Sequence, residues 1–258
     1  VTIELYPNQS LAPNWEAMEA IVTGGIDMGS HGPLPEYEAR FAVTWLDFMF
    51  DSWEQAYAAW SPGGWMWEWI VPLMREKLNV ETLGLLPGGS QGVSNKIRPI
   101  RVPDDLKGLR MRHPAWGSER LELQNYGATP VEMASSEIYT SLQQGVIDGE
   151  WGGGPELAWW WFGDKRIIKY HTHLKHAYEI NTFAMNLKAF NSMPPEYQRI
   201  FREEGLKATR PLMDVYPYVE EEYKANMREH GIEIINQEDL TPQELQQWKD
   251  KAYAFWPK

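Results

Sequence analysis

Three blocks between residues 104 and 150 decide the fold class: DDLKGLRMR at 104–112, GATPVEM at 127–133 and EIYTSLQQGVIDGE at 137–150. The first block ends in alternating apolar and basic residues, which predicts a strand over 109–112. The second predicts a strand over 129–132. The third predicts an amphipathic helix over 136–144 that returns to a strand near 146–149. Strands that alternate with helices in this order are typical of an α/β protein with a parallel sheet.

Arg112 ends the first of these predicted strands. Ligands of open α/β sheets bind beyond the carboxyl ends of strands, where a guanidinium can hold a carboxylate through two parallel hydrogen bonds. The alternative is a salt-bridge arginine at the surface. Arg110 is interpreted as structural. Glu150 and Trp151 end the last predicted strand and are expected at the mouth of the same layer as Arg112.

The rest of the chain continues the alternation of helices and strands. Val1 to Tyr6 alternates like a strand, and with the helix and strand that follow it predicts a βαβ unit. Gly-rich residues 87–92 suit a hinge, because glycine absorbs torsional change cheaply. Pro211 and Pro217 are expected to kink or divide a long helix. The further predicted elements are helices at 14–23, 53–60, 65–78, 117–126 and 194–231, a last helix capped by Thr241, and strands at 26–29, 80–86 and 178–186.

Composition excludes several classes of function. The 258 residues carry a net charge of −12, which argues against nucleic acid and anionic membrane surfaces as partners. The chain has no cysteine, so disulfides, thiolate metal sites and cysteine nucleophiles are excluded. No apolar run approaches the roughly 20 residues of a membrane span. The 14 tryptophans are interpreted mainly as core packing.

These blocks, together with ELYPN at 4–8 and GIDMG at 25–29, resemble the periplasmic solute-binding proteins of tripartite ATP-independent (TRAP) transporters, the DctP type. The resemblance implies an α/β fold of two lobes around a hinge cleft, with a long helix that spans both lobes. Lobe I would be residues 1–89 with 178–218, and lobe II residues 90–177 with 219–258. A strand and a helix normally precede this point in the family, so an N-terminal βα unit is expected to be missing.

The resemblance also implies the function. Such a protein is periplasmic and not an enzyme, captures a small organic acid by hinge closure and delivers it to TRAP permease subunits. Arg112 matches the arginine that holds the ligand's carboxylate. Because no charged and apolar leader precedes Val1, a signal peptide is expected to have been removed. No nucleic-acid partner is expected, and a monomer and a homodimer both stay open.

The segment IDGEW at 147–151 is nearest to members that bind 2-oxo or 2-hydroxy acids. In those members a Na⁺ or Ca²⁺ ion bridges to the ligand, and Gln91, Glu150 and the Trp151 carbonyl match its ligands. No cofactor is required, and the ion stays open because the motif here lacks one residue. In the alternative, Glu150 accepts hydrogen bonds from arginine or backbone amides. Gly152 lets the backbone approach a ligand closely.

Other polar residues are weaker candidates for ligand contact. Ser135 is interpreted as a helix N-cap, with the cleft as the alternative. Tyr139 could donate its phenol hydrogen to a ligand, and Ser30 and His31 could face the ligand from the opposite lobe. Two segments are interpreted as structural. The histidines at 171, 173 and 176 have a zinc site as the alternative. The aromatic run 159–162 has as its alternative a tryptophan wall over an aromatic acid.

Two other functions remain as alternatives. One is a metal-assisted hydrolase or lyase that uses Glu150, His31 and a divalent ion. The other is a binding protein for a neutral ligand such as a sugar. The sequence places no convincing general base, and it has no nucleophile elbow, P-loop, HExxH motif or dinucleotide fingerprint.

Overall fold

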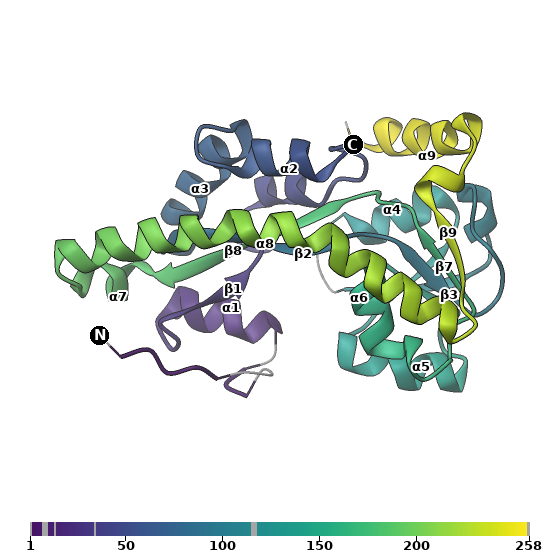
Figure 1. The fold of residues 1–258 in the computed structure, drawn as a ribbon, viewed down its shortest axis with the longest axis horizontal. Coiled ribbons are helices and arrows are strands. Elements are labelled where there is room, and N and C mark those ends of the chain that lie inside the picture. Colours follow the sequence, from purple (N-terminus) through teal and green to yellow (C-terminus); the bar gives the residue numbers. More distant parts are fainter. Residues whose placement is uncertain (1, 7–9, 13, 34, 115–117, 257–258) are drawn as a thin grey trace. The chain divides into compact units, whose positions relative to one another are not determined.

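The computed structural model describes residues 2–6, 10–12, 14–33, 35–114 and 118–256 (Figure 1). The chain divides into two compact units. Unit 1 comprises Val1–Pro33, Tyr57–Pro87 and Ile180–Asp214, and unit 2 comprises Leu34–Ala56, Gly88–Glu179 and Val215–Lys258. Residues 34–56, which the sequence-based division assigned to lobe I, belong to unit 2 by their contacts.

Unit 1 is built around a three-stranded sheet of order β1-β8-β2. Strand β1 (Met28–His31) runs antiparallel to β8 (Tyr178–Asn186), and β2 (Val80–Ser90) is the other neighbour of β8. The helices of this part of the chain are α1 (Asn14–Thr23), α3 (Trp65–Leu78) and α7 (Leu187–Ser192), with α2 (Trp53–Trp60) beginning in unit 2.

Two glycines bring the long helix α8 (Pro195–Glu229) against strand β2 in unit 1. A Cβ atom on Gly84 would lie 2.5 Å from the carbonyl oxygen of Gly205, and one on Gly205 would lie 2.3 Å from that of Leu83. Any side chain at either position would therefore push the helix and the strand apart. Nearby, Leu83, Met185 and Phe190 form a small buried cluster in this unit.

Helix α8 supplies residues to both units, since the boundary falls at Asp214 and Val215. The helix continues through Pro211 and Pro217, so the predicted division is wrong. Both prolines are exposed, and each removes one N–H from the hydrogen-bond ladder of the helix. The predicted kink stays a prediction.

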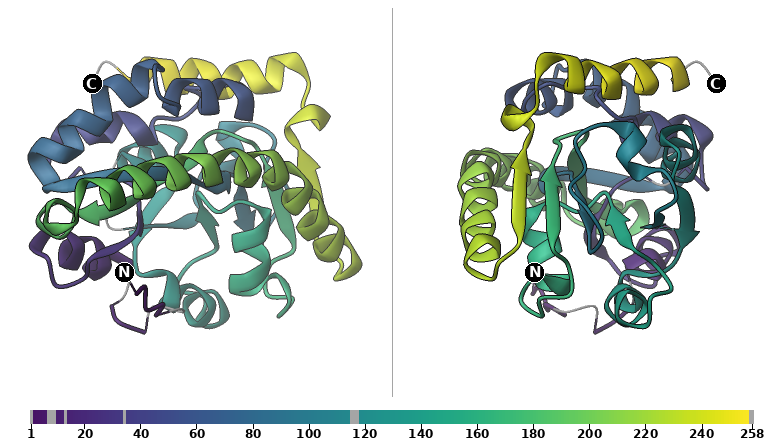
Figure 2. Two further views of the ribbon diagram at one scale, coloured as in Figure 1. Left: turned by 60° about the vertical axis from the view of Figure 1, so that its left-hand side comes forward. Right: turned by 90° about the vertical axis from the view of Figure 1, so that its right-hand side faces the viewer.

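Unit 2 contains a six-stranded mixed sheet of order β5-β4-β6-β3-β7-β9 (Figure 2). Parallel pairs join β4 to β5, β4 to β6 and β7 to β9, whereas the central β3 is antiparallel to β6 and β7. The strands are β3 (Val93–Asn95), β4 (Arg110–His113), β5 (Thr129–Glu132), β6 (Gly149–Trp151), β7 (Tyr170–His173) and β9 (Glu233–Asn236).

Two hydrophobic clusters form the core of unit 2. One gathers Met111, Trp151 and Trp248, and the other gathers Ile138, Phe162 and other residues from the segment 138–168 and from α8 and β9. The helices of this unit are α4 (Glu119–Tyr126), α5 (Ile138–Gln144), α6 (Pro155–Ala158) and α9 (Pro242–Phe255), with short turns η1 (Ala39–Trp45), η2 (Pro103–Leu106), η3 (Ser135–Glu137), the π-helical η4 (Trp159–Gly163) and η5 (Gln237–Asp239).

Most predicted elements are confirmed. Helices α1, α2 and α3 and strands β5 and β8 have the predicted limits. Thr241 caps α9 as predicted: its hydroxyl accepts the Glu244 N–H at 3.2 Å, and the Glu244 carboxylate accepts the Thr241 N–H at 2.7 Å. No described helix combines the length and the apolar character needed to cross a bilayer.

The βαβ unit predicted from residues 1–6, 14–23 and 26–29 is wrong in its two strands. Residues 2–6 form no strand, because alternation sets which side chains share a face but a strand also needs a hydrogen-bonded neighbour. Strand β1 begins at Met28 and pairs antiparallel with β8, so no parallel βαβ unit forms among the described residues. Strand β6 begins at Gly149, three residues after the predicted start, and β3 and β9 were not predicted.

Candidate functional site

Strand pairing in unit 2 places Arg112 beside Glu150. Arg112 of β4 is the register partner of Glu150 of β6, and Glu150 is the partner of Ser94 in β3. Ser94 is in turn the partner of His171 in β7. Directly paired residues project to the same face of a sheet, so a row of four buried polar side chains crosses four strands.

Arg112 is only 4% exposed and keeps part of its hydrogen-bonding capacity. Its Nε donates to the carbonyl oxygen of Met133 at 3.1 Å, and its Nη1 lies 3.7 Å from Glu150 Oε1, too far for a hydrogen bond. Burial lowers the pKa of Arg112, while the charge of Glu150 opposes that effect. Among the described residues, its two Nη atoms have no hydrogen-bond acceptor. The guanidinium carbon lies 5.7 Å from the centre of the Trp161 ring.

Glu150 is 1% exposed, and neither of its carboxylate oxygens has a hydrogen-bond partner in the described part of the chain. Burial raises the pKa of Glu150 to about 7, although the nearby Arg112 acts in the opposite direction. A Cβ atom on Gly153 would come within 2.9 Å of Glu150 Oε2, so the carboxylate lies directly against the backbone of Gly153. The carboxyl group is therefore held close to backbone, without a hydrogen bond but within ion-pair distance of Arg112.

Glu119, the first residue of α4, is a second buried acid at this place. It is 4% exposed, and its Oε2 has no partner among the described residues. Burial raises the pKa of Glu119 well above its usual range, with Arg112 opposing and Glu150 reinforcing the shift. Its Oε1 lies 3.3 Å from the position of a Cβ on Gly152, and the side-chain oxygen of Gln91 lies 3.8 Å from the same point.

Gln91 is 5% exposed and follows the end of β2. Its backbone N–H donates to the Ala177 carbonyl at 2.8 Å, and its side-chain Nε2 donates to Glu179 Oε2 over a long 3.5 Å. Gly152 has a φ of +101°, a conformation that favours glycine. Arg112, Glu150, Glu119, Gln91 and Gly152 thus lie in one neighbourhood of unit 2, which we call the Arg112 site.

The whole chain, residues 1–258, matches the DctP family, described as bacterial extracellular solute-binding protein, family 7. The chain belongs to this family. The predicted resemblance is therefore confirmed at the level of the family, whose members are TRAP transporter solute-binding proteins and not enzymes. The family is extracytoplasmic.

Individual relatives agree with this assignment. A solute-binding protein from Verminephrobacter eiseniae is 26% identical over 244 residues, which are 92% of this chain and 70% of the relative. A TRAP periplasmic solute-binding protein from Chromohalobacter salexigens, solved with D-glucuronate, has a TM-score of 0.89 at 21% identity, covering 98% of this chain and 82% of its own. Another TRAP periplasmic solute-binding protein, from Haemophilus influenzae and solved with L-gulonate, has a TM-score of 0.87 at 24% identity. The match covers 98% of this chain and 80% of that chain. The two solved structures confirm the two-lobed α/β fold.

In this family member the Trp151 side chain belongs to the core and not to the Arg112 site. Strand alternation turns it to the face opposite Glu150, where it stacks on His176 with ring centres 4.2 Å apart. His176 Nδ1 bonds to Asp47 Oδ1 at 2.7 Å, and Tyr126 donates to Asp47 Oδ2 at 2.6 Å. Only the backbone of Trp151 is left for the predicted contact with a ligand or an ion.

Ser135 and Tyr139 lie in η3 and α5. The N-cap interpretation of Ser135 is wrong: no serine side chain caps the turn, and the Glu137 carboxylate instead accepts the Ala134 N–H at 3.1 Å. A glutamate three residues after the N-cap position commonly reaches back to the N-cap N–H in this way. The Tyr139 ring has the Lys165 ammonium 5.3 Å from its centre. Ligand contact by Ser135 or Tyr139 stays a prediction.

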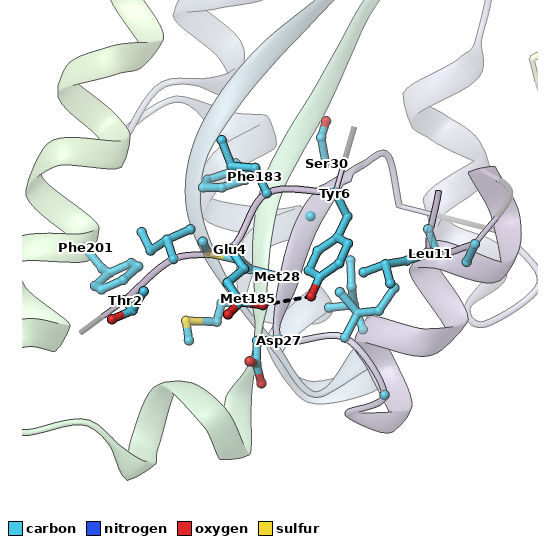
Figure 3. A pocket seen from close by; sticks show the side chains of 18 of the residues that line it. Thr2, Glu4, Tyr6, Leu11, Asp27, Met28, Ser30, Phe183, Met185 and Phe201 are labelled. Carbon is cyan, nitrogen blue, oxygen red and sulfur yellow. Dashed lines mark hydrogen bonds between the residues drawn. The ribbon is translucent and has the colours of Figure 1, made fainter. Parts of the chain in front are cut away.

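Ser30 lies in unit 1, where it lines a pocket of about 740 Å³ under the N-terminal segment (Figure 3). Its walls are largely apolar, with Met28, Phe183 and Met185 among them, and the Tyr6 hydroxyl donates to Glu4 across one side at 2.8 Å. The charged lining residues are both acidic, Glu4 and Asp27, so this pocket does not suit a carboxylate. The side chain of His31 lies outside the described part of the structure, and its predicted role stays a prediction.

The histidines at 171, 173 and 176 have separate partners. His171 bonds to Ser94 at 2.8 Å, and burial lowers its pKa to about 3. His173 Nε2 lies 2.7 Å from the Ser90 hydroxyl, which donates to Glu220 at 2.6 Å. Within the described chain, no group of three or more His, Asp and Glu side chains is arranged to hold a metal ion.

The buried Ser90, His173 and Glu220 do not form a nucleophilic triad. The carboxylate of Glu220 contacts the serine itself and accepts both its hydroxyl and its backbone N–H. The other ring nitrogen of His173, Nδ1, has no partner among the described residues, so nothing orients the ring as a base. Because all three are buried, this cluster is interpreted as structural.

The aromatic run is divided between the core and the Arg112 site, and contact of a tryptophan with a ligand stays a prediction. Phe162 is buried in the core, and Trp159 packs edge-on against His230. Trp161 instead lies beside the Arg112 guanidinium, within cation–π range. Sequence reasoning missed Glu119 entirely, because an acid in the first turn of a helix is ordinarily a solvated partner of the helix dipole.

Proposed function

We propose that the protein captures a small organic carboxylate at Arg112 and delivers it to the membrane permease of a TRAP transporter. The observation that carries the proposal is the buried Arg112 guanidinium, whose two Nη atoms have no acceptor among the described residues. A buried cation without hydrogen bonds is costly, and a carboxylate supplies both charge and acceptors in the planar geometry that arginine prefers. Closure of the two units around the ligand completes the proposal, as the family implies.

A monocarboxylate with a hydroxyl or oxo group on carbon 2 is the proposed ligand class. The acids Glu150 and Glu119 act electrostatically on Arg112, so a second carboxylate next to that arginine would meet negative charge. The solved relative from Haemophilus influenzae holds L-gulonate, which is itself a 2-hydroxy acid. Trp161 offers an apolar surface next to Arg112 for the ligand's carbon skeleton.

A Na⁺ or Ca²⁺ ion bridging the ligand remains part of the proposal. The chemistry of the donors fits, because hard cations favour carboxylate, amide and carbonyl oxygens. Glu150 has two carboxylate oxygens without hydrogen-bond partners, and the Gln91 amide bonds through its nitrogen, which leaves its oxygen. Glu150, Gln91 and the backbone of Trp151 would hold the ion. The ion would supply positive charge that stabilises the bound carboxylate.

A panel of acids tests the proposal. Thermal shift is measured with pyruvate, L-lactate, D-gluconate, L-gulonate, D-glucuronate, succinate and D-glucose, each with EDTA and with Ca²⁺, since a ligand of the native state raises its stability. Monocarboxylates are expected to raise the midpoint, and glucose is expected to leave it unchanged. A response that is lost in EDTA supports the bridging ion.

Calorimetry with the tightest acid then compares two arginine variants from the same strand. Truncating one partner of a buried charge pair costs about 2–5 kcal/mol, so Arg112→Ala is expected to weaken binding by about 30- to 4,000-fold. Arg110→Ala is the matched control, because Arg110 pairs with Asp148 at 2.7 Å and is expected to leave affinity unchanged. Wild-type affinity in a folded Arg112→Ala variant would refute the proposal.

A further inference from the structure

The Arg112 site contains more acid than base. Arg112 faces both Glu150 and Glu119, and the field at Glu119 includes the further acids Asp47 and Glu179. A ligand that brought only a carboxylate would satisfy Arg112 and leave buried acceptors without donors. An unmade hydrogen bond to a buried acceptor is costly, so this arrangement implies a ligand that also carries a donor.

The geometry points to Glu119 as the residue that selects a ligand with a hydrogen-bond donor, a hydroxyl or an ammonium group, next to the carboxylate held by Arg112. This inference rests on the proposed function and adds the property that separates good ligands from poor ones. A 2-hydroxy or 2-amino acid would bind in preference to the same acid with hydrogen on carbon 2.

Three observations place Glu119 in this role. It is the first residue of α4 and is 4% exposed, with Oε2 lacking any partner among the described residues. Its other oxygen lies next to the backbone of Gly152, where the Gln91 oxygen also comes close. Burial raises the pKa of Glu119, with the Arg112 charge as the opposing influence. The unpaired acceptor therefore lies within the electrostatic reach of the carboxylate-binding group.

Structural acids in the same unit look different. Asp47 is equally buried, but both of its oxygens accept hydrogen bonds, from Tyr126 and His176. Glu122, one turn further along α4, resembles Glu119 in being buried without a hydrogen-bond partner among the described residues. The charges that shift its pKa, however, include Asp47 and Glu119 and not Arg112. Glu122 is therefore a matched control on the same helix.

The test compares acids that differ only at carbon 2. Affinities of propionate, lactate and alanine, each enantiomer of the latter two, and of D-gluconate and 2-deoxy-D-gluconate are measured by calorimetry in EDTA. Wild-type protein is expected to prefer each donor-bearing acid to its partner by about tenfold or more. Glu119→Met is expected to bring that ratio close to one, whereas Glu122→Met is expected to preserve it.

A charge-only variant distinguishes the two kinds of donor. Glu119→Gln keeps an acceptor but cannot ionise opposite an ammonium group, so it is expected to retain the preference for lactate and to lose that for alanine. Thermal midpoints of the ligand-free variants separate recognition from structure. Replacing a buried, unpartnered carboxyl is expected to leave the midpoint unchanged or higher, whereas a structural role would lower it.

Several results would overturn the inference. An unchanged ratio in Glu119→Met, or an equal fall in Glu122→Met, removes Glu119 as the selecting residue. A preference that exists only with added Ca²⁺ assigns the selection to the ion. Absence of binding by every acid, or wild-type affinity in Arg112→Ala, instead defeats the proposed function on which the inference rests.

Discussion

Replacing Glu150 with glutamine is expected to remove a defined part of the protein's pH dependence. Burial raises the pKa of Glu150 from 4.5 to about 7 in the folded protein. Between these two values the folded state binds the proton and the unfolded state does not, so the free energy of unfolding falls as the pH rises. At about 1.4 kcal/mol for each pH unit, this group lowers stability by about 3 kcal/mol between pH 4.5 and pH 8.

The assay is equilibrium unfolding in urea at pH 4.5, 6 and 8, in EDTA and without ligand. Far-ultraviolet circular dichroism and tryptophan fluorescence are followed together, because coincident transitions establish two-state behaviour. The difference between wild type and Glu150→Gln isolates this group from the other buried acids, whose pKa values are raised in the same direction. Between pH 4.5 and pH 8, the free energy of unfolding of Glu150→Gln is expected to fall by about 3 kcal/mol less than that of the wild type.

Glu233→Gln is the control, since Glu233 is an exposed acid on the edge strand β9 of the same sheet. It is expected to unfold with the wild-type pH dependence. Equal pH dependence of wild type and Glu150→Gln would show that Glu150 ionises normally, which would refute the interpretation of Glu150 as a buried acid without hydrogen bonds.

Two further substitutions test the core behind the Arg112 site. Trp151→Ala removes a fully buried ring that packs on His176, Tyr126 and Trp248, so it is expected to lower the free energy of unfolding by about 3–5 kcal/mol in urea titrations; a loss below about 1 kcal/mol would contradict its placement. Asp47→Asn leaves the Tyr126 hydroxyl or the His176 ring without an acceptor, at an expected cost of about 1–3 kcal/mol. Unchanged stability of this variant at pH 7 would show that the two hydrogen bonds contribute nothing.

The family and its main elements could be predicted from the sequence because they depend on local signals. Hydrophobic periodicity gave the limits of α1, α2 and α3, and a threonine followed three residues later by glutamate gave the start of α9. Arg112 was recognised for a similar reason: a short alternating strand was predicted to end at that residue, and β4 ends one residue later, at His113. Each of these signals is contained in a few consecutive residues, so it can be recognised without knowledge of the tertiary structure.

The candidate site could be predicted only in part. Arg112, Gln91, Glu150 and Gly152 do lie in one neighbourhood. Glu119 was missed because periodicity assigns acids to solvent, and its burial follows from how α4 packs in three dimensions, against β5 and against the distant helix α9. The strand predicted over 1–6 failed because pairing is a property of two segments, of which alternation describes only one.

The sequence by itself therefore determined the fold class, the family and the arginine at the end of β4. Tertiary structure decided what surrounds that arginine. Arg112 and Glu150 are partners only because β4 and β6 pair in parallel in one register, and a slip by one residue would turn Trp151 toward Arg112 and Glu150 into the core. Register depends on the packing of both sheet faces at once, which is why no pattern within a single strand contains it.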